Sequence, residues 1–184
     1  MWPWGHLAFG YVLCSVYSRL VYRNPPDAAA VLAIVLGTQL PDLVDKPLTW
    51  TLHVLPSGRS LAHSVFAAVL VSAIVWAYCR KRGRSDLGAV FAISYFSHLV
   101  ADGYTYLFTG EYAYLSYLGW PLLPPPPFGD EGTFLTHLQD ISLSPGFALQ
   151  LVIAVAVYVV WIEDGAPGRA AVGTLVERVR SSRR

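Results

Sequence analysis

Histidine and aspartate residues in this sequence have the spacing of ligands for a metal ion. His98 and Asp102 are four positions apart, so on a helix their side chains project from one face and can reach a common ion. Further candidates of the same two residue types are His6, Asp42, Asp45 and His63. Imidazole combined with carboxylate is typical of zinc, manganese or iron sites. We therefore predict a divalent metal centre, with zinc as the leading candidate.

A metal centre of this kind can activate water. Six candidate ligands exceed the four that a tetrahedral ion takes, so the sequence allows one ion, or two ions bridged by a carboxylate. A bound ion with an open position lowers the pKa of its water and produces a nucleophile near neutral pH. Arg59 could hold a phosphate oxygen or anchor the lipid headgroup region, and His137 is a candidate general acid. These residues predict metal-dependent hydrolysis.

The composition places these residues in a membrane protein. The chain has 184 residues, of which 54% are hydrophobic and only 14% are charged, against roughly 25% in soluble domains. The two cysteines, Cys14 and Cys79, both lie in apolar stretches, which excludes a disulfide framework and a paired-cysteine metal site. A soluble enzyme is therefore the poorer interpretation.

Five apolar windows approach the roughly 17 to 25 residues that a helix needs to cross a bilayer. They cover residues 7–22, 28–44, 61–79, 87–108 and 146–162. The sequence shows no internal repeat and no second domain. We predict an all-α, polytopic membrane helix bundle with about five transmembrane helices, formed as a single domain over residues 1–184. An outer loop at 109–145 and a cytoplasmic tail at 163–184 complete it.

The distribution of basic residues sets the orientation of these helices. Short cytoplasmic loops are enriched in lysine and arginine. Basic residues follow the first, third and fifth windows, whereas residues 105–161 contain no lysine or arginine. The N-terminus and the outer loop therefore belong outside and the C-terminus belongs in the cytoplasm, as in a multi-pass protein of the plasma (inner) membrane. The same pattern accounts for the positive charge without a nucleic-acid partner.

The candidate ligands fall in one layer of the predicted bundle. A helix rises about 1.5 Å per residue, so the candidates on the first four windows lie roughly 18 to 27 Å from the inner ends of their helices. Ionisable residues inside a membrane are costly and point to function. We expect the metal centre near the outer face, with membrane lipid beside it and a phospholipid or related phosphoester as substrate.

Four motifs of this chain resemble those of the YdjM-like family of membrane-bound, predicted metal-dependent hydrolases. They are GH at 5–6, GTQLPDLVD at 37–45, GRSLAHS at 58–64 and SHLVADGYT at 97–105. Together they extend over the first four windows, about three fifths of the chain, and leave out the outer loop and the last window. The resemblance implies a membrane-bound enzyme that uses a metal ion for hydrolysis.

The order of the same residues is also similar to the zinc-dependent phospholipase C and single-strand nuclease group, which is all-helical and binds a cluster of zinc ions. That similarity implies one ion shared by His6 and Asp102, and another surrounded by Asp42 or Asp45 with His63, His98 and Asp102. It points to phosphoester hydrolysis. The chain lacks the additional histidines of the third ion in that group unless His137 substitutes.

Two other classes of function are compatible with the residues. Intramembrane aspartates and histidines also serve ion- or proton-coupled transport, but a relay needs polar residues in the inner halves of the windows, and those of the second, third and fourth windows are almost wholly apolar. The same cluster could hold a structural metal in a non-catalytic membrane partner. An intramembrane metalloprotease is disfavoured because the sequence contains no HExxH. The sequence leaves the oligomeric state open.

Overall fold

The structure of the protein, a computed structural model, describes residues 1–129, 131–133, 135–136, 144–170, 173–174 and 181. Within these residues the chain is all-helical and forms no strand. The elements are α1 (Pro3–Tyr22), α2 (Ala28–Trp50), α3 (Val65–Lys81), α4 (Ser85–Thr109), the 3₁₀ helix η1 (Tyr112–Gly119) and α6 (Pro145–Glu163). The prediction of an all-α fold is confirmed.

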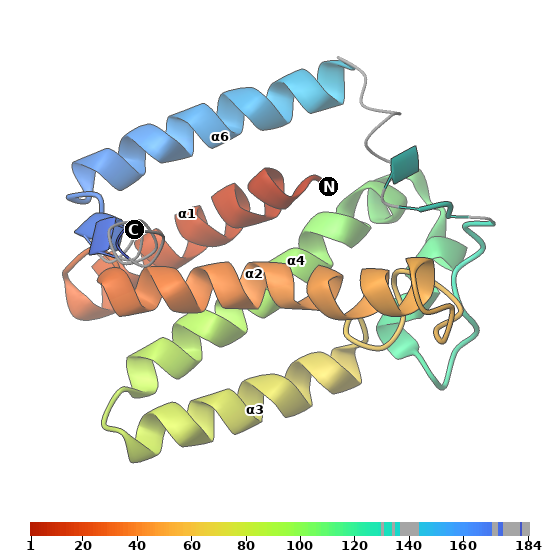
Figure 1. Ribbon diagram of the computed structural model, residues 1–184, viewed down its shortest axis with the longest axis horizontal. Helices are drawn as coiled ribbons and strands as arrows, with labels where there is room; N and C mark the ends of the chain where they lie inside the picture. Colours follow the sequence, from red (N-terminus) through yellow and green to blue (C-terminus); the bar gives the residue numbers. More distant parts are fainter. Residues whose placement is uncertain (130, 134, 137–143, 171–172, 175–180, 182–184) are drawn as a thin grey trace.

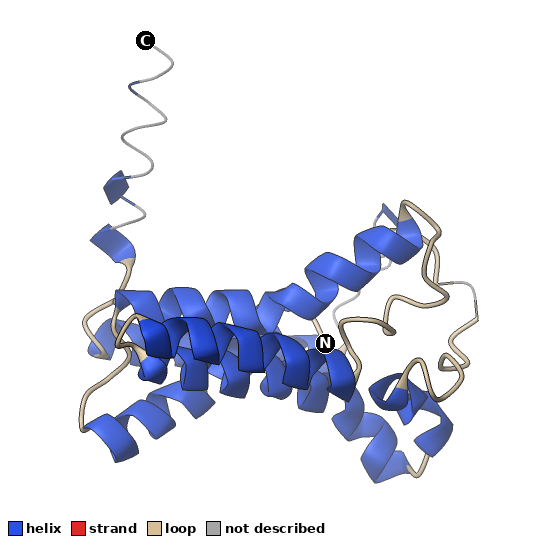
Figure 2. Cartoon of the chain, turned by 90° about the horizontal axis from the view of Figure 1, so that it is seen from below, coloured by secondary structure: helices blue, strands red, loops and turns tan. Residues whose placement is uncertain are grey.

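Helix α4 lies at the centre of the bundle and packs against α1, α2 and α3, while α6 lies at the edge along α1 (Figure 1). The long helices run roughly along one direction, and the loops gather at the two ends (Figure 2). One apolar core contains Tyr11, Ile34 and Val90 from α1, α2 and α4. A second core contains Ala68 of α3 and Tyr95 of α4. The bundle therefore holds α4 from three sides.

Helices α2 and α4 approach each other closely at Gly37. A Cβ atom on Gly37 would lie 2.7 Å from the Phe91 carbonyl oxygen and 2.7 Å from Ser94 Cβ. Small residues are the ones that let helix backbones come this near in membrane proteins. Both helices carry candidate ligands, so the missing side chain at Gly37 sets the distance between them.

Two helix ends differ from the predicted windows. Helix α3 begins four residues later than predicted, because the Ser64 hydroxyl accepts a hydrogen bond from the Ala67 N–H and caps the helix. Helix α2 continues six residues past its predicted end, and Lys46 donates to Asp42 one turn earlier at 2.6 Å. His63 consequently lies in the turn before α3, whereas Asp42 lies inside α2.

Two helices are long and apolar enough to cross a membrane by length and composition. They are α2 and the segment Gly146–Glu163 of α6. Helix α3 has 17 residues, and α4 includes His98 and Asp102. For the part of the chain that the structure describes, the five-span topology stays a prediction.

Replacement of Gly37 by alanine should lower the stability of the protein. The added methyl group meets a backbone carbonyl, which cannot yield unless α4 moves, so we expect a loss of about 1 to 3 kcal/mol in the free energy of unfolding. Thermal unfolding of the detergent-purified protein measures this loss. Gly146→Ala is the control, because a Cβ atom there meets nothing within 4 Å. Equal melting temperatures for the two variants would contradict the close approach.

Candidate metal centre

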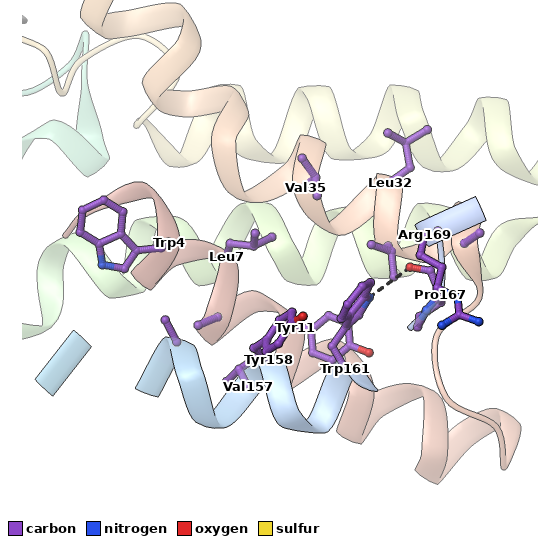
Figure 3. Close-up of a pocket in the computed structure, with 15 residues that line it drawn as sticks. Trp4, Leu7, Tyr11, Leu32, Val35, Val157, Tyr158, Trp161, Pro167 and Arg169 are labelled. Carbon is purple, nitrogen blue, oxygen red and sulfur yellow. Dashed lines mark hydrogen bonds between the residues drawn. The ribbon is translucent and has the colours of Figure 1, made fainter. Parts of the chain in front are cut away.

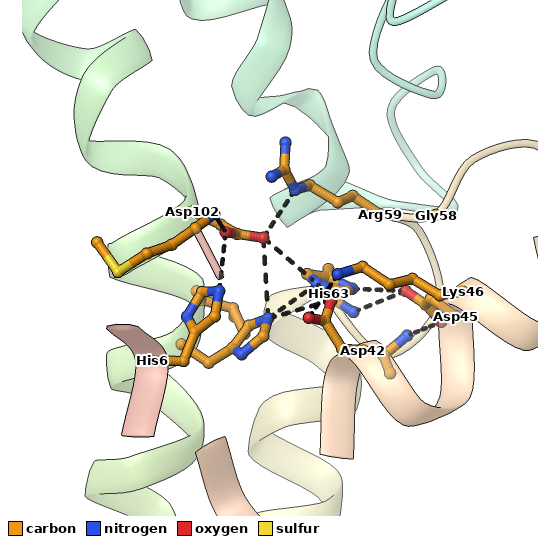
Figure 4. A network of polar contacts seen from close by, with 12 residues as sticks. His6, Asp42, Asp45, Lys46, Gly58, Arg59, His63 and Asp102 are labelled. Atoms are coloured by element: carbon orange, nitrogen blue, oxygen red, sulfur yellow. Dashed lines mark hydrogen bonds and ion pairs between the residues drawn. The ribbon is translucent and has the colours of Figure 1, made fainter. Parts of the chain in front are cut away.

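Four ligand atoms from three parts of the chain converge inside the bundle. Figure 4 shows three of the residues, Asp42, His63 and Asp102, turned toward one another. Asp42 lies on α2, His98 and Asp102 lie on α4, and His63 lies in the turn before α3. One ligand atom from each residue lies within 4.8 Å of the other three, and all four residues are buried. We call these four residues the candidate centre, and they can hold a metal ion.

The distances within the candidate centre match the spacing of ligands around one ion. His63 Nε2 lies 3.0 Å from His98 Nε2. Asp42 Oδ1 lies 3.5 and 3.7 Å from these two nitrogens, and Asp102 Oδ2 lies 3.6 and 3.8 Å from them. Ligands about 2.0 to 2.1 Å from a tetrahedral zinc ion are about 3.3 to 3.4 Å apart. Two imidazoles and two carboxylates in this arrangement fit a divalent ion.

The second nitrogen of each imidazole shows where the protons lie. His98 Nδ1 is 2.6 Å from the Thr38 carbonyl oxygen, which can only accept, so Nδ1 carries the proton. His63 Nδ1 is 2.8 Å from Asp45 Oδ2 and donates to that carboxylate in the same way. Both Nε2 atoms then present lone pairs to each other. Only an added proton or a metal ion can satisfy two such acceptors in a buried site.

Asp45 fixes the segment that carries His63. Its carboxylate accepts hydrogen bonds from the backbone N–H groups of Ser60, Ala62 and His63 at 2.9, 2.8 and 3.1 Å. These bonds and the His63 ring occupy both of its oxygens. The structure therefore places Asp45 behind His63, outside the four-residue candidate centre. A carboxylate in this position orients a ligating histidine and raises its basicity.

Pro41 lies in the turn of α2 that follows Thr38. Proline has no N–H, so the carbonyl four residues earlier, that of Gly37, loses its helical donor. The neighbouring Thr38 carbonyl accepts from His98 at 2.6 Å. The LPDLVD motif thus supplies Asp42 to the candidate centre and begins within one turn of the carbonyl that holds an imidazole.

His6 lies against the candidate centre from α1. Its ring stacks on His98 with the centroids 3.8 Å apart, and its Nε2 is 3.2 Å from Asp102 Oδ1. That contact lacks hydrogen-bond geometry, and neither ring nitrogen of His6 has a hydrogen-bond partner among the described residues. Asp42 Oδ1 is also buried without one. Buried polar atoms rarely go unpaired, so these are the atoms expected to face an ion.

Arg59 connects the candidate centre to the outer loop. Its Nε donates to Asp102 Oδ2 at 2.7 Å (Figure 4). Its guanidinium lies over Phe128, 5.1 Å from the ring centroid. Burial by itself would lower the pKa of Arg59, but the Asp102 carboxylate raises the pKa above its ordinary value. The side chain is therefore charged. Its two terminal nitrogens make no hydrogen bond within the described part of the chain.

A carboxylate of the outer loop belongs to the same region, and sequence reasoning missed it. Glu131 accepts from the Ser57 hydroxyl at 2.5 Å and from the Gly58 N–H at 2.9 Å. A Cβ atom on Gly58 would lie 2.6 Å from Glu131 Oε2, so a larger residue there would displace this carboxylate. The glycine of the GRS motif was the available signal, but nothing in the sequence paired it with Glu131. His137, the candidate general acid, lies outside the described residues.

The fold and the site define a class of protein, an all-helical bundle with a buried centre of histidine and aspartate that can hold a metal ion. The YdjM inner membrane protein family matches residues 1–166, so the chain belongs to this family of the inner membrane. The match includes the outer loop and α6, beyond the four motifs that first carried the resemblance. No curated protein and no solved structure matches the chain.

The candidate centre predicts a metal content that depends on His98. Elemental analysis of the purified protein should find stoichiometric zinc, manganese or iron in the wild type, and His98→Ala should lose it because one of two imidazole ligands is gone. His53→Ala is the matched control, since His53 is exposed and outside the candidate centre. A wild-type protein that stays metal-free after zinc or manganese is supplied would contradict the assignment.

Asp45→Asn should weaken metal binding without removing a ligand. An amide cannot orient and polarise the His63 imidazole as the carboxylate does, so we expect the affinity for zinc to fall by about 10- to 100-fold. Competition against a chelator of known affinity measures this change, and the melting temperature shows whether the variant is folded. A folded Asp45→Asn protein with wild-type affinity would show that Asp45 only supports the turn.

Proposed function

We propose that the protein is a membrane-bound, metal-dependent hydrolase that cleaves a phosphoester, such as a phospholipid, at the outer membrane face. The proposal depends on one observation, the pair of buried imidazole nitrogens 3.0 Å apart that lies between two carboxylates. A zinc ion held by the candidate centre would supply Lewis acidity and an activated water. The proposal includes five spans with the N-terminus outside, because that orientation puts the candidate centre near the outer headgroups.

The surrounding residues have separate roles in this proposal. Asp45 and the Thr38 carbonyl hold the two imidazoles in the orientation that presents Nε2 to the ion. Arg59 binds a phosphate oxygen through its terminal nitrogens and stabilises the negative charge that develops during cleavage. His6 lies 3.2 Å from Asp102 Oδ1 and is proposed to share that carboxylate with a second ion. His137 is proposed as the general acid.

Aromatic side chains support a position near the lipid headgroups. Trp2 stacks on Trp4 with the centroids 5.1 Å apart, close to His6 in the sequence. Tyr106 stacks on Tyr114 at 4.9 Å, one turn beyond Asp102. Tryptophan and tyrosine are enriched where a membrane meets water. A phosphoester at this depth is therefore most simply the headgroup linkage of a lipid.

Arg59 gives the sharpest test of phosphoester hydrolysis. The zinc-loaded, detergent-purified protein would be assayed against a chromogenic phosphodiester and a fluorogenic phospholipid. We expect Arg59→Gln to lower kcat/KM by about 10²- to 10³-fold, the effect of removing one donor to a developing anion. Arg59→Lys should recover part of the loss, because it restores the charge without the two-pronged geometry.

The metal content separates a catalytic role of Arg59 from a structural one. Arg59→Gln should keep the wild-type metal content, its melting temperature shows whether the variant is folded, and Arg82→Gln, at the inner end of α3, should keep the wild-type rate. A zinc-loaded wild type with no activity on either substrate would favour the non-catalytic interpretation of the candidate centre.

A further inference from the structure

Helix α6 is fastened to α1 at both ends. At the outer end, Gln150 Oε1 accepts from the Trp2 N–H at 3.0 Å, and Phe147 meets Trp4 edge to face with the centroids 5.7 Å apart. At the inner end, Asp164 accepts from the Tyr11 hydroxyl at 2.6 Å and the Ser15 hydroxyl at 3.2 Å, and it pairs with Arg19. Two polar attachments thus hold α6 in place along α1.

A groove of about 690 Å³ lies between these attachments, bounded by α1, α2 and α6 (Figure 3). Its walls are almost wholly apolar and include Leu7, Leu32, Val35 and Val157. The volume is within the range of roughly 300 to 1,000 Å³ that is typical of ligand sites. None of its lining residues belongs to the candidate centre, so the groove is a separate site.

The Arg169 end of the groove carries the charged group that indicates an occupant, and the Trp4 end carries an aromatic ring. Arg169 lies at the inner end, and its guanidinium makes no ion pair within the described residues, since Asp164 is paired with Arg19. Trp4 lies at the outer end, where its indole N–H is buried and has no hydrogen-bond partner among the described residues. An apolar channel with an unpaired cation at one end is complementary to an anionic lipid.

We propose that this groove binds one anionic phospholipid from the leaflet at the Arg169 end. The phosphate lies against Arg169, and an acyl chain follows the apolar wall toward Trp4. Exposed side chains of α2 and α6, such as Leu32 and Tyr158, leave the groove open on the side that faces the bilayer of an inner membrane protein. The bound lipid fills the space that the two attachments of α6 keep between α6 and α2.

Native mass spectrometry of the full-length protein in detergent tests this site. Phosphatidylglycerol and phosphatidylcholine with identical acyl chains would be added in turn, and the lipid-bound fraction would be measured. We expect preferential retention of phosphatidylglycerol, and a decrease of about fivefold in its affinity in Arg169→Gln, as for one basic side chain facing an anionic lipid. Ala154→Trp should abolish retention of both lipids, because Ala154 lines the groove.

Two matched variants serve as controls. Arg82→Gln removes an arginine at the inner end of α3, and Ala156→Trp adds an indole to an exposed position of α6 outside the groove lining. Both should retain phosphatidylglycerol as the wild type does, and all four variants should keep the wild-type metal content, so the result is independent of the proposed hydrolysis.

Equal retention of the two lipids, or no effect of Arg169→Gln, would overturn the proposal. A wild-type dimer that Ala154→Trp dissociates without any change in lipid retention would overturn it too, because a second copy of the chain would then occupy the groove.

Discussion

The structure depends on two imidazole nitrogens that face each other as acceptors 3.0 Å apart. Each ring donates a hydrogen bond from its other nitrogen. His63 donates to the Asp45 carboxylate, and His98 donates to the Thr38 carbonyl. Both rings are fully buried, so water does not relieve the conflict. A cation between the two nitrogens replaces the repulsion of their lone pairs with attraction. The carboxylates of Asp42 and Asp102 lie close enough to strengthen the binding of that cation. The site is therefore arranged for a positive charge, which a proton on one ring or a metal ion supplies.

Burial of so many charged groups in a membrane protein requires compensation from the fold. Gly37 lets α2 approach α4, which brings Asp42 toward the ligands on α4. Pro41 interrupts the backbone hydrogen bonds of α2 in the turn after Thr38, whose carbonyl orients His98. Arg59 and Lys46 donate to the two carboxylates of the candidate centre, at 2.7 and 2.6 Å. Each of these features breaks the regularity of an apolar helix bundle, and each one contributes to the same small volume.

The sequence predicts that the candidate ligands lie at one depth in the bundle. It does not predict which of them face the ion and which only support another ligand. The spacing of His98 and Asp102, and the helical rise from each inner end, placed the candidates at one depth. Asp42 and Asp45 looked equivalent in LPDLVD, because only the folded backbone of residues 60–63 shows that Asp45 is surrounded by N–H groups. Thr38 orients His98 through its backbone carbonyl, and a backbone contact cannot be predicted from the pattern of side chains. Window analysis likewise extended α3 too far, since the Ser64 cap outweighs the apolar residues before it.

The short segment from Ser57 to His63 explains how the outer loop and the candidate centre are joined. The hydroxyl of Ser57 and the N–H of Gly58 hold Glu131 of the outer loop, the next residue contacts Asp102, and the backbone that follows binds Asp45. The ring of Phe128 lies against the same Arg59 side chain that reaches Asp102. Displacement of the outer loop would therefore move Asp102 through its contact with Arg59. It would also move His63 through the backbone between Ser57 and His63. A side chain at position 58 would displace the Glu131 carboxylate, so the glycine of the motif that carries His63 supports this connection.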